Sequence, residues 1–141
     1  MGDVMSLVRI QETPLDVGEV YDAVRSASAG GIALFVGTVR DHDSGRSVRS
    51  LGYTAHPGAV GVLRGVLAEV DADHEVLAMA VVHRVGNLAI GDEAVVTAVA
   101  CAHRGEAFVV CRELIDKVKS RVPIWKHQVF EDGTEEWVGT P

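Results

Sequence analysis

Basic residues and histidines gather in one stretch of this chain, from Cys101 to Gln128. Six of the thirteen Lys and Arg residues lie in these 28 residues, together with only three of the twenty acidic residues. The stretch therefore carries a formal charge of +3, whereas the other 113 residues carry −10. A local cationic region on an acidic protein is suited to a small anion rather than to a broad polyanion.

The pattern of apolar residues predicts that this stretch forms a helix and then a strand. Between residues 105 and 121 the apolar positions recur at helical spacing, at Ala107, Phe108, Cys111, Leu114, Ile115 and Val118. Pro123 cannot continue a helix and favours extended backbone at Val122, so a strand should follow. Side chains alternate along a strand, which puts Lys126 and Gln128 on one side and His127 on the other.

The basic side chains lie at positions where they are able to bind an anion. His103 and Arg104 immediately precede the predicted helix, where free backbone N–H groups and the helix dipole favour negative charge. Lys119 lies in the last helical turn, where a cation also complements the dipole without any further function. Both interpretations of Lys119 are open on spacing alone.

One further basic residue, Arg40, comes from earlier in the chain. Arg40 ends one apolar strand and His103 follows another, so we expect both at the same edge of a sheet. Arg binds phosphate through two parallel hydrogen bonds, and His or Lys adds compact charge. We therefore expect one phosphate-sized pocket formed by Arg40, His103, Arg104, Lys119 and Lys126.

The elements that must position these residues fit one domain spanning residues 1–141. The first helix should be capped by Thr13, with Pro14 at its first position, and should stop near residues 29–31. A second helix should follow residues 56–58 and bury Val60, Leu63, Val66, Leu67 and Val70. Apolar strands are expected at 7–10, 32–39, 48–55, 76–82 and 94–100, with a mobile polar loop at 41–47 and a hairpin turn at 131–134. The order β-α-β-β-α-β-β-α-β-β predicts an α+β fold, with about three helices packed on a mixed or antiparallel sheet.

Composition excludes several classes of function. A net charge of −7 argues against nucleic acid and anionic membranes, which require a broad basic face. Residues 1–6 do not resemble a signal peptide, and no apolar run approaches the length of a membrane span, so the cytosol is the expected compartment.

Cys101 and Cys111 match no metal or redox spacing and are expected to be small buried hydrophobes. Asp41, His42 and Asp43 are adjacent and are expected in a solvated loop rather than around a metal. No histidine of the set His42, His56, His74 and His83 is expected to have more than a structural role.

Several short motifs together resemble one known family. They are Phe35-Val36-Gly37-Thr38-Val39-Arg40-Asp41-His42, His83-Arg84-Val85-Gly86, Gly91-Asp92-Glu93, Ala102-His103-Arg104, and Lys119 with Pro123-Ile124-Trp125-Lys126. In order and spacing, from about residue 4 to residue 138, they resemble the large (catalytic) subunits of molybdopterin synthase, the MoaE family. Each motif is weak alone, and the combination is specific.

The resemblance implies an α/β-hammerhead fold and a sulfurtransferase activity. In that family a central homodimer of large subunits binds a small ubiquitin-like subunit at each end, giving a heterotetramer. The small subunit's C-terminal thiocarboxylate supplies sulfur to cyclic pyranopterin monophosphate, forming the molybdopterin dithiolene of the molybdenum cofactor. No metal or redox cofactor is required of the large subunit. The family's substrate contacts correspond here to Thr38, Val39, Arg40, His103, Arg104, Lys119, Lys126, His127 and Gln128, and its catalytic lysines to Lys119 and Lys126. Which of these residues come from the neighbouring large subunit stays open.

Some positions depart from the family pattern. Thr54 stands where Glu is frequent, Ala59 where Met is usual, and His127 where a permanent cation follows the Trp-Lys pair, which reduces the charge at neutral pH. The sequence ends at Thr140-Pro141, where many relatives continue with basic residues. Two other functions remain open: a ferredoxin-like module that binds an anionic metabolite and regulates a partner, and a small phosphatase of the acylphosphatase kind.

Overall fold

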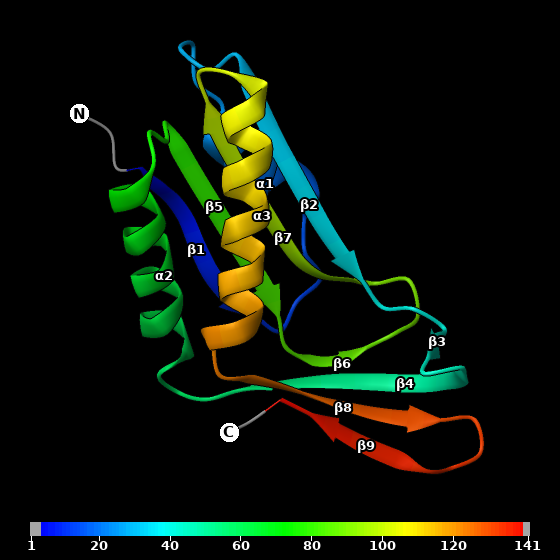
Figure 1. Ribbon diagram of the computed structural model, residues 1–141. Helices are drawn as coiled ribbons and strands as arrows, with labels where there is room; N and C mark the ends of the chain where they lie inside the picture. Colours follow the sequence, from blue (N-terminus) through cyan, green and yellow to red (C-terminus); the bar gives the residue numbers. More distant parts are fainter. Residues whose placement is uncertain (1–3, 140–141) are drawn as a thin grey trace.

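The computed structural model describes residues 4–139 of the chain, and three helices and two sheets account for most of them (Figure 1). The helices are α1 (Val17–Val24), α2 (Ala59–Asp73) and α3 (Arg104–Arg121). The strands are β1 (Met5–Gln11), β2 (Gly31–Thr38), β3 (His42–Asp43), β4 (Arg46–Ala55), β5 (Ala78–Arg84), β6 (Gly86–Leu88), β7 (Glu93–Cys101), β8 (Ile124–Phe130) and β9 (Glu135–Val138). The predicted α+β class with three helices is confirmed, and the structure adds the two short strands β3 and β6 to the expected order.

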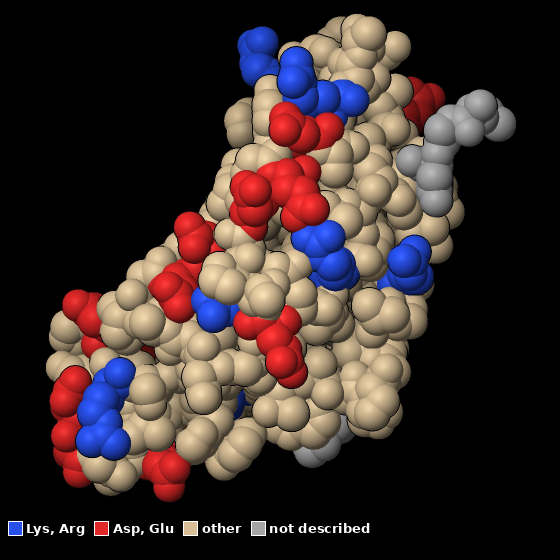
Figure 2. All heavy atoms as spheres, turned by 180° about the vertical axis from the view of Figure 1, so that it is seen from behind, with Lys and Arg blue, Asp and Glu red and all other residues tan. Residues whose placement is uncertain are grey.

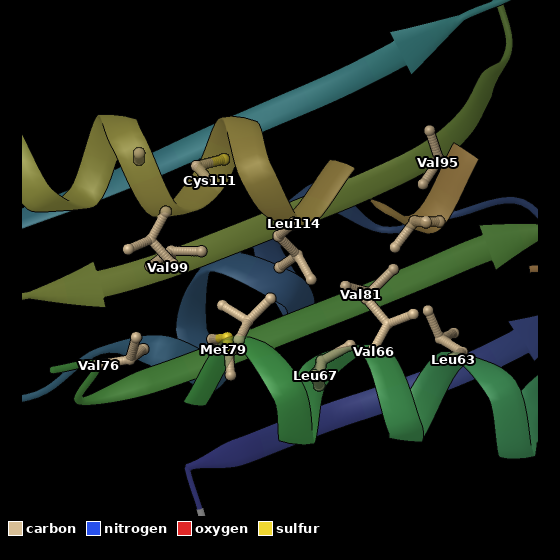
Figure 3. Close-up of a cluster of buried hydrophobic side chains, with 14 of the residues drawn as sticks. Leu63, Val66, Leu67, Val76, Met79, Val81, Val95, Val99, Cys111 and Leu114 are labelled. Carbon is tan, nitrogen blue, oxygen red and sulfur yellow. The ribbon is translucent and has the colours of Figure 1, made fainter. Parts of the chain in front are cut away.

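The first sheet has four strands in the order β1-β5-β7-β2. β1 and β5 are parallel, whereas β5 pairs with β7 and β7 with β2 in the antiparallel sense. Helices α2 and α3 cover one face of this sheet, and α1 covers the other (Figure 1). Buried side chains from α2, α3, β5 and β7 interdigitate in the larger core (Figure 3), among them Leu63, Val66, Leu67, Met79, Val81, Val95, Val99, Cys111 and Leu114.

The second sheet lies across one end of the first (Figure 1). Its strands follow the order β3-β4-β8-β9, all antiparallel, and β6 also pairs with β4. Helix α3 runs down the first sheet and ends beside β8, so the chain enters the second sheet directly from the helix (Figure 1). The C-terminal end of α3 is thereby placed between the two sheets.

Helix α1 begins later than the sequence predicts. Its N-cap is Asp16, whose carboxylate accepts a hydrogen bond of 3.2 Å from the backbone N–H of Glu19. This bond satisfies one of the N–H groups that lack a partner in the first turn of a helix. Thr13 lies in a bend and Pro14 follows it before the helix begins, and the Gln11 amide donates to both of their carbonyl groups. The expected Thr13 cap is therefore wrong because Asp16 caps the helix instead.

The polar segment 41–47 is ordered into a hairpin rather than forming a mobile loop. β3 and β4 are joined by Ser44 and Gly45, whose φ angles are +53° and +74°. Two successive residues with positive φ match the twist of a tight antiparallel hairpin. The backbone N–H of Val48 also donates to the carbonyl of Asp41 at 2.8 Å. The pairing fixes the position of this segment relative to the second sheet.

The apolar faces of the helices agree with the predicted spacing at most positions. Ala107, Cys111, Leu114 and Val118 of α3 are buried, as are Leu63, Val66, Leu67 and Val70 of α2. Both cysteines are buried and free, as expected, and burial raises the pKa of each thiol. One position was predicted wrongly: Val60, expected on the buried face of α2, is 39% exposed. Phe108, which lies beside the buried positions of α3, is 67% exposed.

The surface gives no indication of a broad basic face on the side opposite α2 and α3. Figure 2 shows Lys and Arg atoms interspersed with Asp and Glu atoms there, between larger uncharged areas. Among residues 4–139, no helix has the length and apolar character needed to cross a membrane.

Candidate active site

Lys119 and Lys126 converge where helix α3 meets the second sheet. Lys119 lies in the last turn of α3, and Lys126 lies on β8 opposite Tyr53 of β4. The ammonium nitrogen of Lys119 is 5.7 Å from the centroid of the Tyr53 ring, which faces its positive charge. The helix that reverses into a strand thus brings both lysines close to the same tyrosine ring.

The pKa of Lys119 is lowered from its ordinary value. The main cause is desolvation by surrounding protein atoms, and the second is the positive charge of Lys126. The residue keeps substantial solvent exposure in the isolated chain. The effect therefore comes from crowding around the ammonium end and from a neighbouring cation, not from complete burial of the side chain.

Arg40 and Lys126 line a small cavity of about 70 Å³ between the end of β2 and the second sheet. The cavity is bounded by Thr38, Val39, Arg40, His42, Asp43, Leu51, Tyr53, Lys126 and Gln128. Five of the predicted substrate contacts are thus brought together: Thr38, Val39, Arg40, Lys126 and Gln128.

One carboxylate already interacts with these cations. Asp43 lies 3.7 Å from Arg40, and the buried amide of Gln128 donates to its other oxygen at 2.6 Å. The Gln128 hydrogen bond is the largest cause of the lowered pKa of Asp43, and the charges of Lys126 and Arg40 lower it further. The cavity therefore stabilises a negative charge, which is what a phosphate site requires.

His103 does not share an edge of the sheet with Arg40, contrary to the sequence prediction. β2 and β7 are antiparallel, and Gly31 at the start of β2 pairs with Cys101 at the end of β7. His103 therefore lies beside the start of β2, whereas Arg40 follows its end. A strand of this length separates them by roughly 30 Å.

Arg104 is equally far from the two lysines within one chain. It begins helix α3, and Lys119 lies in the last turn, so about 22 Å of helix separate them. His103 and Arg104 are both exposed at the opposite end of the molecule from the second sheet (Figure 1). The predicted five-residue pocket is not formed within a single chain.

His127 faces away from the lysines, as strand alternation predicts. Its ring stacks on Trp137 with centroids 4.5 Å apart, and its Nε2 lies 2.9 Å from a carboxylate oxygen of Glu135. These contacts join β8 to β9 on the outer side of the sheet. His127 thus lies outside the cavity that contains Lys126 and Gln128.

Three residues of the site were not identified from the sequence: Asp43, Tyr53 and His83. The sequence pattern places Asp43 in a solvated loop and gives His83 a structural role. His83 is 2% exposed, and its ring meets the Tyr53 ring edge-on, with the two ring centroids 5.0 Å apart. A histidine at the end of a continuously apolar strand was the available signal, because burial of a polar ring there requires a specific partner.

An apolar groove of about 500 Å³ leads along β2 and α3 to Lys119. Exposed Leu34, Phe35 and Phe108 line it, at 42%, 40% and 67% exposure. β2 is an edge strand, and among the described residues no strand pairs with its outer side. Exposed aromatic and aliphatic side chains beside an unpaired edge are typical of a protein–protein contact.

Comparison with known proteins gives consistent matches. The family model for MoaE protein matches residues 10–121. Molybdopterin synthase catalytic subunit 1 of Mycobacterium tuberculosis is 43% identical over 132 residues, covering 93% of this chain and 89% of that protein. The molybdopterin synthase catalytic subunit of Bacillus subtilis is 38% identical over 136 residues, covering 96% and 86%. The crystal structure of molybdopterin synthase from Staphylococcus aureus matches with a TM-score of 0.86 at 30% identity, covering 93% of this chain and 96% of that one.

Proposed function

Because the chain belongs to the MoaE family, we propose that it acts as the catalytic subunit of a cytoplasmic molybdopterin synthase. In this proposal it is a sulfurtransferase. It moves sulfur from the C-terminal thiocarboxylate of a small ubiquitin-like subunit to cyclic pyranopterin monophosphate, and two transfers give the molybdopterin dithiolene. The observation that carries the proposal is the convergence of Lys119 and Lys126 beside the anion-stabilising cavity that contains Arg40.

The inventory of charges suits this reaction. The pterin substrate is a phosphate ester and the sulfur donor is an anionic thiocarboxylate, so two negative groups must approach one another. Cations held in place before binding offset the repulsion and stabilise the charge that develops when the cyclic phosphate opens. We assign the phosphate to the cavity of Arg40, Lys126 and Gln128, where Asp43 now interacts with Arg40.

Lys119 is the proposed central catalytic residue, with Lys126 as its partner. A lysine with a lowered pKa is a neutral amine in a larger fraction of molecules near neutral pH. A neutral amine is able to transfer protons or to capture an acyl group transiently. The positive charge of Lys126 contributes to the lowered pKa and also attracts both anionic substrates.

His103 and Arg104 enter the proposed site from a second copy of the chain. If two copies pack along the edge strand β2 and helix α3 about a two-fold axis perpendicular to these elements, the elements run antiparallel across the interface. The start of one α3 then lies beside the end of the other, which brings the partner copy's cationic pair towards Lys119. The exposed apolar side chains Leu34, Phe35 and Phe108 fit such a contact. The homodimer, with a small subunit bound to each copy, gives the proposed heterotetramer.

Reconstitution tests the proposal. The protein is mixed with thiocarboxylated small subunit and cyclic pyranopterin monophosphate, and molybdopterin is measured. Lys119→Ala should reduce product formation by at least ~10²-fold, the lower range for loss of an acid–base group. Lys117→Ala is the matched control. Lys117 lies two residues before Lys119 on the same helix, and its ammonium group forms an ion pair with Glu69 instead. Near-normal synthesis by Lys119→Ala would remove Lys119 from the mechanism.

The same experiment separates the two other functions. An anion-binding regulator would bind the pterin without consuming the thiocarboxylate. A phosphatase would release phosphate or open the cyclic phosphate without any sulfur donor. Sulfur-dependent product formation by the wild-type chain supports the synthase and excludes both.

A further inference from the structure

A second cavity lies beside Lys119, and Arg40 is not part of its lining. Its volume is about 30 Å³, and it is lined by Tyr53, His83, Val118, Lys119, Val122 and Ile124. A space of this size holds one water molecule if at least two polar groups face it. Lys119 and His83 provide two nitrogen atoms of different character, one a donor and the other an acceptor.

The hydrogen bond of His83 determines which of its ring nitrogens is free. Nδ1 lies 2.7 Å from the backbone carbonyl oxygen of Arg84, and a carbonyl oxygen only accepts, so Nδ1 carries the proton. Burial and the charge of Lys119 lower the pKa of His83 to about 4, so the ring is neutral at neutral pH. Nε2 therefore offers a lone pair, and no residue between 4 and 139 donates a hydrogen bond to it.

We propose that this cavity is a binding site for one water molecule through which His83 positions Lys119. The water accepts a hydrogen bond from Nζ of Lys119 and donates one to Nε2 of His83. Tyr53 closes the cavity with its ring, which contacts His83 edge-on and lies beneath the ammonium group. His83 is thus a positioning residue for the proposed catalytic lysine, and this inference rests on the proposed function.

The need for such an anchor follows from the charges around Lys119. The titratable and charged groups around it are Tyr53 on β4, His83 on β5, Lys126 on β8, and Cys111, Arg112 and Asp116 on α3 itself. Asp116 lies 3.7 Å from Arg112 along the helix, so its charge is already paired. Lys126 repels the ammonium group of Lys119. A neutral acceptor behind Lys119 holds the side chain in place without neutralising it by an ion pair.

Three substitutions of His83 distinguish positioning from structural support. His83→Gln places an amide oxygen near the former Nε2 and keeps an acceptor for the water. His83→Asn places an amide N–H near the former Nδ1 and keeps the bond to the Arg84 carbonyl. His83→Phe keeps the aromatic contact with Tyr53 and removes both polar groups. A structural role is preserved by Asn, whereas a positioning role is preserved by Gln.

The first measurement is the titration of Lys119 by NMR on protein with ¹³C,¹⁵N-labelled lysine. The chain has three lysines, at 117, 119 and 126, so the spectrum is readily assigned with Lys→Arg variants. Loss of the acceptor removes stabilisation of the ammonium form, so the Lys119 midpoint should fall by about one pH unit in His83→Phe and His83→Asn. In His83→Gln it should stay near the wild-type value.

The second measurement is the steady-state kinetics of molybdopterin formation. His83→Phe and His83→Asn should reduce kcat about tenfold with a smaller change in KM, because the substrate contacts other than Lys119 remain and only this lysine is displaced. His83→Gln should recover most of the activity. If Asn behaves as wild type and Gln does not, or if no variant moves the Lys119 midpoint or kcat, His83 is only structural and the inference is wrong.

The two proposals fail in different ways. Full activity in Lys119→Ala overturns the catalytic role of Lys119, while the NMR titration still tests the water site. An unchanged titration in all His83 variants, with Lys119→Ala inactive, overturns the water site and leaves the proposed function standing. If His83→Phe fails to fold, the comparison of Gln with Asn decides the question.

Discussion

At the scale of single residues, the environment determines what each lysine and histidine is able to do. Lys117 forms ion pairs with Glu69 and Glu113, and its pKa is raised, chiefly by the hydrogen bond to Glu69. Lys119 lies two residues further along the same helix and has a lowered pKa. The two side chains differ because one faces carboxylates of α2 and α3 and the other faces Lys126 and aromatic rings.

The first prediction is that Lys119 loses its proton at a lower pH than Lys117. The proposed reaction uses the neutral amine of Lys119, so product formation should rise with pH as this lysine loses its proton. Because its pKa is lowered, this rise should begin closer to neutral pH than for an ordinary lysine. Lys126→Met should move the Lys119 midpoint upward by removing a repelling charge. Lysine NMR titration checks both statements, and Arg121→Met, at an exposed position bound to Glu69, is the control. A Lys119 midpoint at or above that of Lys117 would contradict the prediction.

The second prediction concerns acid stability. His83 has an ordinary pKa of 6.5 when unfolded and about 4 when folded. As pH falls below 6.5 the unfolded chain takes up this proton first, so the free energy of unfolding falls, by about 3 kcal/mol when pH 4 is reached. Well above pH 6.5 the His83 ring is neutral in both the folded and the unfolded chain, so the free energy of unfolding is not reduced there. Urea unfolding between pH 7 and pH 5 measures the slope, and His83→Gln should lack the His83 part of it. Equal slopes in both proteins would refute the assignment.

At the scale of elements, the β3–β4 hairpin brings a carboxylate into the cation site. Its turn at Ser44 and Gly45 directs Asp43 inward, where the carboxylate meets the amide of Gln128 on β8. Asp41, two residues earlier, bonds to His42 at the surface instead. The hairpin therefore both joins the second sheet and contributes to the electrostatics of the site.

The third prediction is that Asp43→Ala destabilises the protein whereas Asp41→Ala changes its stability little. Removing Asp43 leaves the Gln128 amide, which is 2% exposed, without its acceptor, at a cost of about 1–3 kcal/mol. Asp41 is exposed, and its loss leaves no buried group unsatisfied. Urea denaturation of the two variants checks the difference. Equal stabilities would mean that solvent replaces the lost bond.

At the scale of the whole molecule, the two cationic clusters lie at opposite ends of α3. Arg104 begins the helix, and Lys119 lies in its last turn, at the end beside the second sheet (Figure 1). A small substrate is unable to contact both ends of one chain at once. The proposed two-fold dimer joins them, because antiparallel packing places unlike ends of α3 side by side.

The fourth prediction tests this shared site by complementation. Lys119→Ala and Arg104→Ala homodimers should each be nearly inactive. Mixing them with exchange of subunits gives mixed dimers with one intact site, so that activity should recover to about a quarter of the wild-type value. If all site residues come from one chain, mixing restores nothing.

A companion variant tests the surface that the dimer uses. Phe108→Asp places a charge in the apolar groove beside β2, and it should yield a monomer by sedimentation because burying an unpaired charge opposes association. Tyr21→Asp is the matched control, since Tyr21 is 42% exposed on α1, on the other face of the sheet. An unchanged dimer in Phe108→Asp would move the interface elsewhere.

Local sequence patterns were sufficient to predict most of the elements. The period of the apolar residues predicted the buried face of α3, and Pro123 predicted where the helix changes to a strand. Alternation along β8 predicted that Lys126 and His127 face opposite ways. These features depend on neighbouring residues in the chain, so the sequence alone determines them. The α1 cap was missed because Thr13 and Asp16 both fit the local rule, and only the course of the chain selects between them.

The tertiary structure alone decided which functional residues share a site. The sequence does not state whether β2 and β7 are parallel or antiparallel, and that single choice puts Arg40 and His103 at opposite ends of the sheet. The roles of Asp43 and His83 likewise depend on partners 85 residues away and on burial between two sheets. Strand pairing and packing are non-local, because they depend on which distant segments bury each other's apolar faces. Residue types therefore indicate the chemistry available to this chain, and only the packing of its two sheets determines where that chemistry is assembled.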